Sequence, residues 1–282
     1  MSRALAPSEI ALFAQAASLL EVAASKPGNV SRHHDFGDTT FEDFLLSGVA
    51  IGAAMGAAGQ AGVGETVLRS VRDTRRWVSV NTNLGIVLLL APLARAAAQD
   101  GASLRDRLSR VLAALSVEDA VAAYAAIRQA EPGGLGRVEA QDVGSQPTLT
   151  LREAMALAAA RDTIAREYVT DYAVTFDVAL PALRRARGAG LGWSDSALEC
   201  YLRVLADVPD TLVERKAGRE MARAVSGRAR DVLAAGAPGS RERALVAAAF
   251  DAELRGGANR LNPGTSADLV AAALFAALCE ER

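Results

Sequence analysis

Apolar residues recur at helical spacing along almost the whole of this 282-residue chain, and this periodicity limits the folds available to it. In residues 8–24, for example, Ile10, Phe13, Ala16 and Leu20 lie three or four positions apart, which is the pattern of one buried helix face. No stretch alternates apolar and polar residues over the length of a strand, and no rhythm of strand and helix indicates a parallel sheet. The sequence therefore predicts an all-α fold.

Start signals place the expected helices along the chain. A Ser or Thr followed three residues later by an acid is a capping box, which satisfies free N–H groups in the first turn of a helix. This signal occurs at Thr39 or Thr40, Ser116, Thr150 and Thr265. The expected helices cover residues 8–24, 41–58, 65–77, 84–99, 103–114, 116–130, 150–188 (bent before Pro181), 194–206, 214–234, 240–255 and 265 onward.

Composition agrees with helices that pack closely in one domain. Alanine is abundant, aromatic residues are only 5% of the chain, and the apolar fraction of 51% suffices for a substantial core. No flexible linker separates two parts, so we expect a single-domain multi-helix bundle over residues 1–282. Gly48, Gly52 and Gly56 form a smooth stripe that could pack inside one subunit or between two, so a homodimer stays open.

Charge and cysteine content exclude several classes of protein. The formal net charge of −2, without a basic stripe, argues against a nucleic-acid partner. The most apolar run, residues 84–98, is too short to span a bilayer and is interrupted by Pro92 and Arg95. Cys200 and Cys279 lack metal-ligand spacing and fit buried thiols in a reducing compartment, and the N-terminus does not resemble a signal peptide. We therefore expect a cytoplasmic protein with no membrane partner.

Residues 25–40 form an unusually long polar connection between two predicted helices. They contain a Lys-Pro-Gly turn at 26–28 and both histidines of the chain, His33 and His34, next to Asp35. An ordinary connection between helices has about 2–8 residues, and long loops held by packed helices often carry function. Adjacent histidines on a loop point apart, so phosphate binding or proton transfer is expected here rather than a zinc site.

Two further polar loops also end at predicted helix starts. Residues 81–85 read Asn-Thr-Asn-Leu-Gly, and residues 262–266 read Asn-Pro-Gly-Thr-Ser. The free N–H groups and the positive dipole end of a helix start suit phosphate, so three such loops predict a polyanion site if they converge. The loop residues expected to bind phosphate or nucleotide are Lys26, Gly28, Asn29, Arg32, His34, Asn81, Thr82, Asn83, Gly85, Asn262, Gly264, Thr265 and Ser266.

Carboxylates near a phosphate site commonly hold Mg²⁺, which binds through one or two carboxylates together with waters and substrate oxygens. Glu139 and Asp142 lie in a glycine-rich segment with little other reason for charge, whereas acids within helices usually cap them or face solvent. The Walker and Rossmann glycine signatures are both absent. The predicted magnesium ligands are Asp35, Glu139, Asp142 and Asp268.

A series of short motifs runs along nearly the whole chain. The motifs are a helix end Leu20-Glu21-Val22 followed by Lys26-Pro27-Gly28, then His33-x-Asp35-Phe36, Phe44-x-x-Ser47, Asn81-Thr82-x-x-Gly85, Gly136-x-x-Glu139-Ala140, Asp210-Thr211-x-x-x-Arg215-x-x-Gly218 and Pro263-Gly264-x-Ser266-Ala267-Asp268-Leu269. In order and spacing they resemble the triphosphoribosyl-dephospho-CoA synthase family. The resemblance implies an all-helical enzyme in which a ribose hydroxyl of dephospho-CoA attacks the anomeric carbon of ATP. Adenine leaves, and the triphosphate stays on the transferred sugar.

The resemblance also suggests roles for individual residues. Asp35 would be the base or a metal ligand, and His33 a phosphate or proton partner. Glu139 and Asp210 would bind metal or ribose, and Arg215 would contact the nucleotide. His33, Asp35, Glu139 and Asp210 are therefore the predicted catalytic residues.

The chain departs from the family pattern at three motifs. The usual Asn-Gly segment between Lys-Pro-Gly and His-x-Asp is absent. Asn83 and Leu84 stand where the family has a His-Lys pair. Asn262 precedes the last Pro-Gly, and Thr265 follows it at a position where glycine is usual. These departures resemble a divergent branch found in archaea and some bacteria. Two alternatives stay open: a related ribosyl transferase with another acceptor, in the synthesis of a pterin-type one-carbon cofactor, and a non-catalytic nucleotide-binding or scaffolding protein.

Overall fold

The structure, a computed structural model, describes residues 3–133, 141–256 and 259–281. The described residues form helices without a β-strand, and only an isolated bridge joins Ser31 to His34. The predicted all-α fold is confirmed. Within these ranges, none of the helices combines the length and the apolarity needed to span a bilayer.

The helices follow the expected order with several additional breaks. They are α1 (Pro7–Ala23), α2 (Phe41–Ala50), α3 (Gly52–Gly56), α4 (Val63–Arg75), α5 (Leu84–Ala97), α6 (Leu104–Ala113), α7 (Val117–Ala130), α8 (Leu151–Ala158), α9 (Thr163–Val169), the π-helical turn η1 (Val174–Ala179), α10 (Leu180–Gly188), α11 (Trp193–Asp207), α12 (Thr211–Ala217), α13 (Arg219–Ala234), α14 (Arg241–Arg255) and α15 (Gly264–Glu280).

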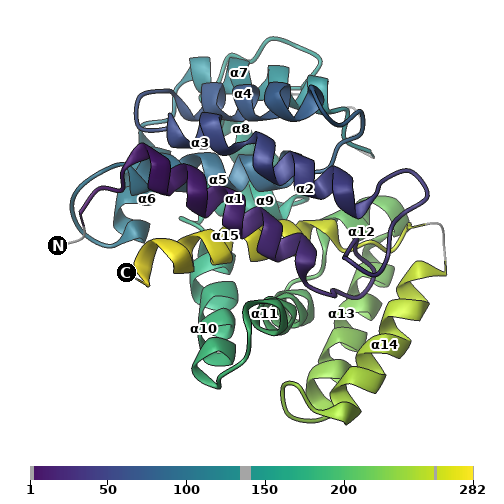
Figure 1. Ribbon diagram of the computed structural model, residues 1–282. Helices are drawn as coiled ribbons and strands as arrows, with labels where there is room; N and C mark the ends of the chain where they lie inside the picture. Colours follow the sequence, from purple (N-terminus) through teal and green to yellow (C-terminus); the bar gives the residue numbers. More distant parts are fainter. Residues whose placement is uncertain (1–2, 134–140, 257–258, 282) are drawn as a thin grey trace.

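Helix α15 forms the centre of the fold. It packs against α1, α5 and α11, and its side chains from Leu269 to Ala277 are buried. Many of them are alanines, whose small side chains allow neighbouring helices to approach from several directions. In Figure 1, α15 crosses the middle of the molecule, with α3, α4 and α7 on one side and α10, α13 and α14 on the other.

Two predicted helices are divided at short breaks. The helix expected at 41–58 ends at Ala50, and the chain restarts as α3 after Ile51. The helix expected at 214–234 starts earlier, at Thr211, and is interrupted at Gly218, whose φ of 93° is incompatible with a continuous helix. After each break, a new helix begins two residues after the preceding helix ends.

The prediction of one long helix over 150–188 is wrong, because side chains replace the helix's own hydrogen bonds. Asp162 ends the first segment and caps α9, with its Oδ1 accepting the N–H of Ala165 at 3.1 Å. The buried Glu167 carboxylate then accepts the N–H groups of Val174 and Thr175, each at 2.9 Å. These contacts divide the segment into α8, α9, η1 and α10, and they place Asp162 at a turn.

Candidate active site

One large cleft opens where loops and helix starts from distant parts of the sequence meet. Its volume is about 1120 Å³, above the roughly 300–1,000 Å³ of a site for one drug-sized ligand. The three polar loops predicted to converge do so here. Of the predicted ligand-binding and metal-binding residues, the cleft is lined by Asn29, Asn81, Thr82, Gly85, Asp142, Arg215, Asn262, Gly264, Thr265 and Asp268.

The start of α15 differs from its predicted form. Pro263 is the N-cap residue, and Thr265 lies within the first turn, so the predicted capping box of Thr265 with Asp268 is wrong. Asp268 instead lines the cleft one turn further along the helix. Because the Asp268 side chain does not cap its own helix, it is available to bind a ligand.

The Asp268 carboxylate stands against the first turn of α5. A Cβ atom built on Gly85 would lie 2.0 Å from its Oδ2, so only glycine permits this approach. Asp268 has no hydrogen bond or ion pair within the described part of the chain. Burial, together with the nearby carboxylates of Glu21, Asp210 and Asp162, raises its pKa well above the usual range. The cleft therefore holds an acid that a bound cation would stabilise.

Replacing Gly85 with alanine is expected to displace the Asp268 carboxylate, because the new methyl group would overlap Oδ2. We expect kcat/KM for the transfer that the sequence resemblance implies to fall by roughly tenfold or more, with the α-helical circular dichroism unchanged. Gly188→Ala is the matched control, since a Cβ there meets nothing within 4 Å. Equal kcat/KM values for the two variants would contradict this assignment.

Arg215 reaches the cleft from α12 and is held by an ion pair. Its Nη1 lies 2.7 Å from Oδ2 of Asp162, the residue that caps α9. Both residues line the cleft, as do Arg161 and Lys216, whose side chains form no ion pair among the described residues. This wall of the cleft thus offers three cationic groups, which suits a polyphosphate.

Asp210 was predicted to be catalytic, but the structure places it behind the cleft as a link between two helix starts. Its side chain is 1% exposed. Oδ1 accepts the N–H groups of Leu212 and Val213 at 2.9 and 3.1 Å. Oδ2 accepts the N–H and the hydroxyl of Ser266 at 2.7 and 2.8 Å. Ser266 is therefore engaged with Asp210 instead of the predicted phosphate, and both residues stabilise the ends of α12 and α15.

Glu21 and Lys26 form a buried ion pair beside the cleft. The Nζ of Lys26 lies 2.9 Å from Oε1 of Glu21 and also donates to the backbone carbonyls of Glu21 and Ala24. Lys26 is 1% exposed and does not line the cleft, whereas Glu21 does. Burial raises the pKa of Glu21, and the ammonium of Lys26 opposes that increase. Lys26 therefore holds an acid in place, which differs from the predicted phosphate contact.

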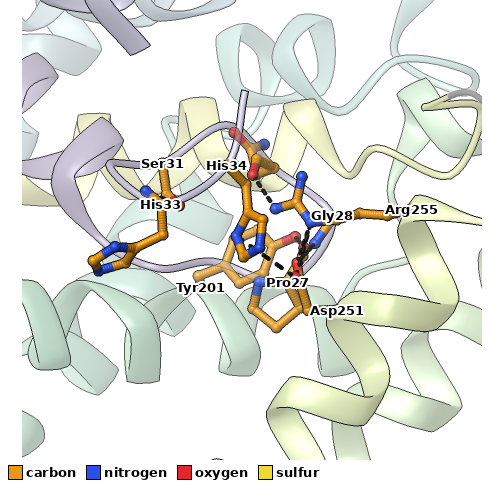
Figure 2. Close-up of polar contacts among 9 residues, drawn as sticks. Pro27, Gly28, Ser31, His33, His34, Tyr201, Asp251 and Arg255 are labelled. Atoms are coloured by element: carbon orange, nitrogen blue, oxygen red, sulfur yellow. Dashed lines mark hydrogen bonds and ion pairs between the residues drawn. The ribbon is translucent and has the colours of Figure 1, made fainter. Parts of the chain in front are cut away.

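The two histidines do not line the cleft. Figure 2 shows His34 turned toward Asp251 and His33 turned away from it, and both side chains are exposed. Asp35 is also exposed, and its Oδ1 accepts the N–H of Phe41 at 2.7 Å at the start of α2. Arg32 is exposed as well, and its Nε donates to the backbone carbonyl of Ala23 at 3.2 Å. The predicted roles of His33, His34, Asp35 and Arg32 thus fall on residues that the structure places outside the cleft.

Helix α14 holds the Lys-Pro-Gly turn in position (Figure 2). Oδ1 of Asp251 accepts the N–H of Gly28 at 2.7 Å, and both Asp251 oxygens pair with Nε of Arg255 at 2.9 and 2.8 Å. The Nη2 of Arg255 donates to the backbone carbonyl of Asn29 at 2.6 Å. The Nδ2 of Asn29 in turn donates to Oδ1 of Asn262 at 3.0 Å inside the cleft. Gly28 has a φ of 74° in this turn, a left-handed conformation that glycine adopts without strain.

Asp251→Ala is expected to release this turn and to raise KM for the ligand that meets Asn29 by roughly three- to tenfold. Removing the carboxylate leaves the N–H of Gly28 and the guanidinium of Arg255 without their partner. Initial rates across a range of ligand concentrations would measure the effect. Asp231→Ala, on the exposed side of α13, is the control, and an equal KM in both variants would contradict the prediction.

The remaining predicted residues are Asn83, Asp142 and Glu139, and they differ in where they lie. Asn83 is buried, and its Nδ2 donates to Oγ1 of Thr74 at 3.0 Å, so it supports the loop before α5 from behind. Asp142 lines the cleft, with its Oδ1 accepting the N–H of Gly144 at 2.8 Å. Glu139 lies outside the described residues. Within those residues, no group of three or more His, Cys, Asp or Glu side chains is placed to hold a metal ion by itself.

Glu21, Arg161 and Lys216 are charged residues of the cleft to which the sequence analysis assigns no role. Glu21 belongs to the helix end Leu20-Glu21-Val22 that forms part of the family resemblance, five residues before Lys26, but the sequence does not show what it does. Arg161 and Lys216 read as ordinary charged surface positions. Each becomes part of the cleft only because of the additional breaks around Asp162 and Gly218.

Comparison with known proteins gives a consistent family assignment. The model of the family described as CitG, ATP:dephospho-CoA triphosphoribosyl transferase, matches residues 7–282. Over 98 residues the chain is 42% identical to an Azotobacter vinelandii protein, and over 97 residues 38% identical to one from Pseudomonas syringae pv. syringae. Both are named as candidate 2-(5''-triphosphoribosyl)-3'-dephosphocoenzyme-A synthases. These matches span 34% of this chain and only about a third, 32% and 33%, of the two relatives.

A solved structure extends the similarity to most of the chain. The crystal structure of a candidate triphosphoribosyl-dephospho-CoA synthase from Archaeoglobus fulgidus superimposes with a TM-score of 0.65 at 26% sequence identity. The match covers 84% of this chain and 98% of that one. The shared fold therefore includes nearly the whole archaeal protein.

Proposed function

Because the chain belongs to the ATP:dephospho-CoA triphosphoribosyl transferase family, we propose that it transfers the triphosphoribosyl group of ATP to dephospho-CoA and releases adenine. The observation that carries this proposal is the cleft of about 1120 Å³, in which the three polar loops meet. Its size suits two nucleotide-like substrates held next to one another. Its lining combines cations for phosphates with acids for the reacting sugar.

The cationic wall is the proposed site for the triphosphate. Arg161, Arg215 and Lys216 face the same cleft, and the ion pair with Asp162 holds Arg215 in a defined position. A guanidinium binds two phosphate oxygens at once, which gives both affinity and orientation. The amide side chains of Asn29 and Asn262, joined by their own hydrogen bond, are suited to sugar hydroxyls or adenine nitrogens.

We propose Asp268 as the protein ligand of a Mg²⁺ ion that enters with ATP. A magnesium site of this kind needs only one or two carboxylates, because waters and phosphate oxygens supply the remaining ligands. Asp268 fits that requirement, since its carboxylate has no hydrogen bond among the described residues and lies near other acids. When bound, the ion would neutralise triphosphate charge and orient the nucleotide.

The transfer replaces the bond from the anomeric carbon to adenine with a bond to the acceptor oxygen. A hydroxyl oxygen of dephospho-CoA supplies the new electron pair, and the pair of the breaking carbon–nitrogen bond leaves with adenine. The hydroxyl loses a proton and adenine gains one, so the overall reaction is balanced.

Release of free adenine from ATP tests the proposal. Purified protein with Mg²⁺ and ATP should release adenine only when dephospho-CoA is added, and an equal amount of triphosphoribosyl-dephospho-CoA should form. Adenine release that requires a different acceptor would identify a related ribosyl transferase. No adenine with any acceptor would contradict the enzymatic proposal.

A further inference from the structure

Among the described residues that line the cleft, Glu21 is the acid that is both deeply buried and left with an oxygen without a hydrogen bond. Its side chain is 2% exposed, on the last turn of α1. Oε1 is sealed from solvent and faces the ammonium of Lys26 at 2.9 Å. Oε2 has no hydrogen bond to any described residue, and it is not among the solvent-sealed atoms that lack a partner. Since Glu21 lines the cleft, Oε2 is the atom that opens onto it.

Lys26 fixes the direction of this oxygen. Its Nζ donates to the carbonyls of Glu21 and Ala24 and lies 2.9 Å from Oε1 in an ion pair. The side chain is 1% exposed and does not line the cleft, so it is held beside Glu21 and away from a phosphate there. The ion pair thus favours the carboxylate form of Glu21 and presents Oε2 in a constant orientation.

The other acids among the described residues of the cleft are engaged or exposed. Asp142 is partly exposed, and its Oδ1 accepts the N–H of Gly144 at 2.8 Å. Asp162 caps α9 and pairs with Arg215, and Glu131 pairs with Arg75 at the exposed rim. Asp38 is exposed and accepts the hydroxyl of Thr39. Asp268 is the proposed ligand of the cation that enters with ATP, and coordination to a cation makes a carboxylate a poor proton acceptor.

We propose that Glu21 is the general base of the transfer, with Oε2 accepting the proton of the attacking hydroxyl. This inference rests on the proposed function. In the step, the acceptor oxygen forms its bond to the anomeric carbon as its proton passes to Oε2, and adenine leaves with the electron pair of its broken bond. The departing adenine takes up one proton from solvent, and Glu21 returns the hydroxyl proton to solvent before the next turnover, so the protons balance.

Glu21→Gln separates this role from binding and from folding. The amide keeps the shape of the side chain and can still accept from Lys26, but it cannot take up a proton. We expect kcat to fall by roughly 10²- to 10⁴-fold while KM for ATP changes by less than about threefold. Glu199→Gln is the matched control, because Glu199 forms a comparable, largely buried pair with Arg243 at 2.5 Å and does not line the cleft.

A second variant tests for the missing base directly. In Glu21→Ala, sodium formate should raise the rate by at least about tenfold, because a small carboxylate can occupy the vacated space and accept the proton. Formate should not affect the wild-type protein or Glu199→Gln. Failure of formate to raise the rate of a folded Glu21→Ala variant would overturn the inference.

The outcomes distinguish the inference from the function on which it rests. If Glu21→Gln retains more than about a third of the wild-type kcat, or changes only KM, Glu21 is not the base. In that case adenine release by the wild-type protein still supports the proposed transfer. If the wild-type protein releases no adenine, the proposed function itself fails.

Discussion

Asp268→Asn is expected to abolish most transfer activity and, at the same time, to stabilise the protein. Without the carboxylate, the proposed magnesium ligand is lost, and we expect kcat to fall by about 100-fold or more. The half-buried acid stands near three other carboxylates, and this environment raises its pKa. A neutral amide of the same shape should therefore raise the free energy of unfolding by about 0.5–2 kcal/mol.

The stabilisation should depend on pH in a defined direction. Folding raises the pKa of Asp268. At pH values above the usual pKa of a carboxyl group, the folded state therefore binds more protons than the unfolded state. The wild-type protein should therefore lose stability as pH rises from that range through the higher folded pKa, and this loss should be smaller in Asp268→Asn. Urea unfolding at several pH values, with EDTA present, measures both proteins. An active Asp268→Asn variant, or parallel pH profiles, would contradict the assignment.

Asp210→Ala is expected to be the most destabilising substitution in the cleft region, at about 3–5 kcal/mol. The change leaves the N–H groups of Leu212, Val213 and Ser266 without partners, and each buried unpaired donor costs about 1–3 kcal/mol. Urea unfolding should show a lower midpoint with an unchanged slope. Asp195→Ala, at an exposed position in the first turn of α11, should change stability by less than about 0.5 kcal/mol.

Asp210→Asn separates a structural from a catalytic role at this position. The amide oxygen can still accept two N–H groups, so the folded protein should keep its activity within about tenfold of wild type. A loss of 100-fold or more in a folded Asp210→Asn variant would support the catalytic role predicted from the sequence and contradict the structural one.

The helices could be predicted because their signals are local. Apolar spacing and capping residues such as Thr40 and Ser116 act within one or two turns, and the structure has helices at those places. The divisions of the long segments could not be predicted in the same way. The break after α9 depends on Glu167, whose hydrogen bonds to Val174 and Thr175 form only when the carboxylate is buried.

The sequence identifies the loops that form the candidate site, but it does not show what each residue does there. Polar loops ending at helix starts identify Asn29, Asn81 and Asn262, which do meet in the cleft. A sequence does not show which side of a loop faces inward, so His33 and Asp35 were assigned chemistry although they lie outside the cleft. The structure gives Asp210 a structural position for a related reason, because a buried acid that satisfies backbone N–H groups cannot be distinguished in sequence from a catalytic one.

The most direct test of the account is a crystal structure of the protein with Mg²⁺, dephospho-CoA and an ATP analogue whose base is joined to the ribose by a carbon–carbon bond that the transfer cannot break. We predict both nucleotides in the one cleft, with the triphosphate between Arg161 and Arg215, the metal ion bound to Asp268, and the acceptor hydroxyl within hydrogen-bond distance of Glu21. A nucleotide bound at the exposed His33–His34 face, or a cleft without either ligand, would contradict the account.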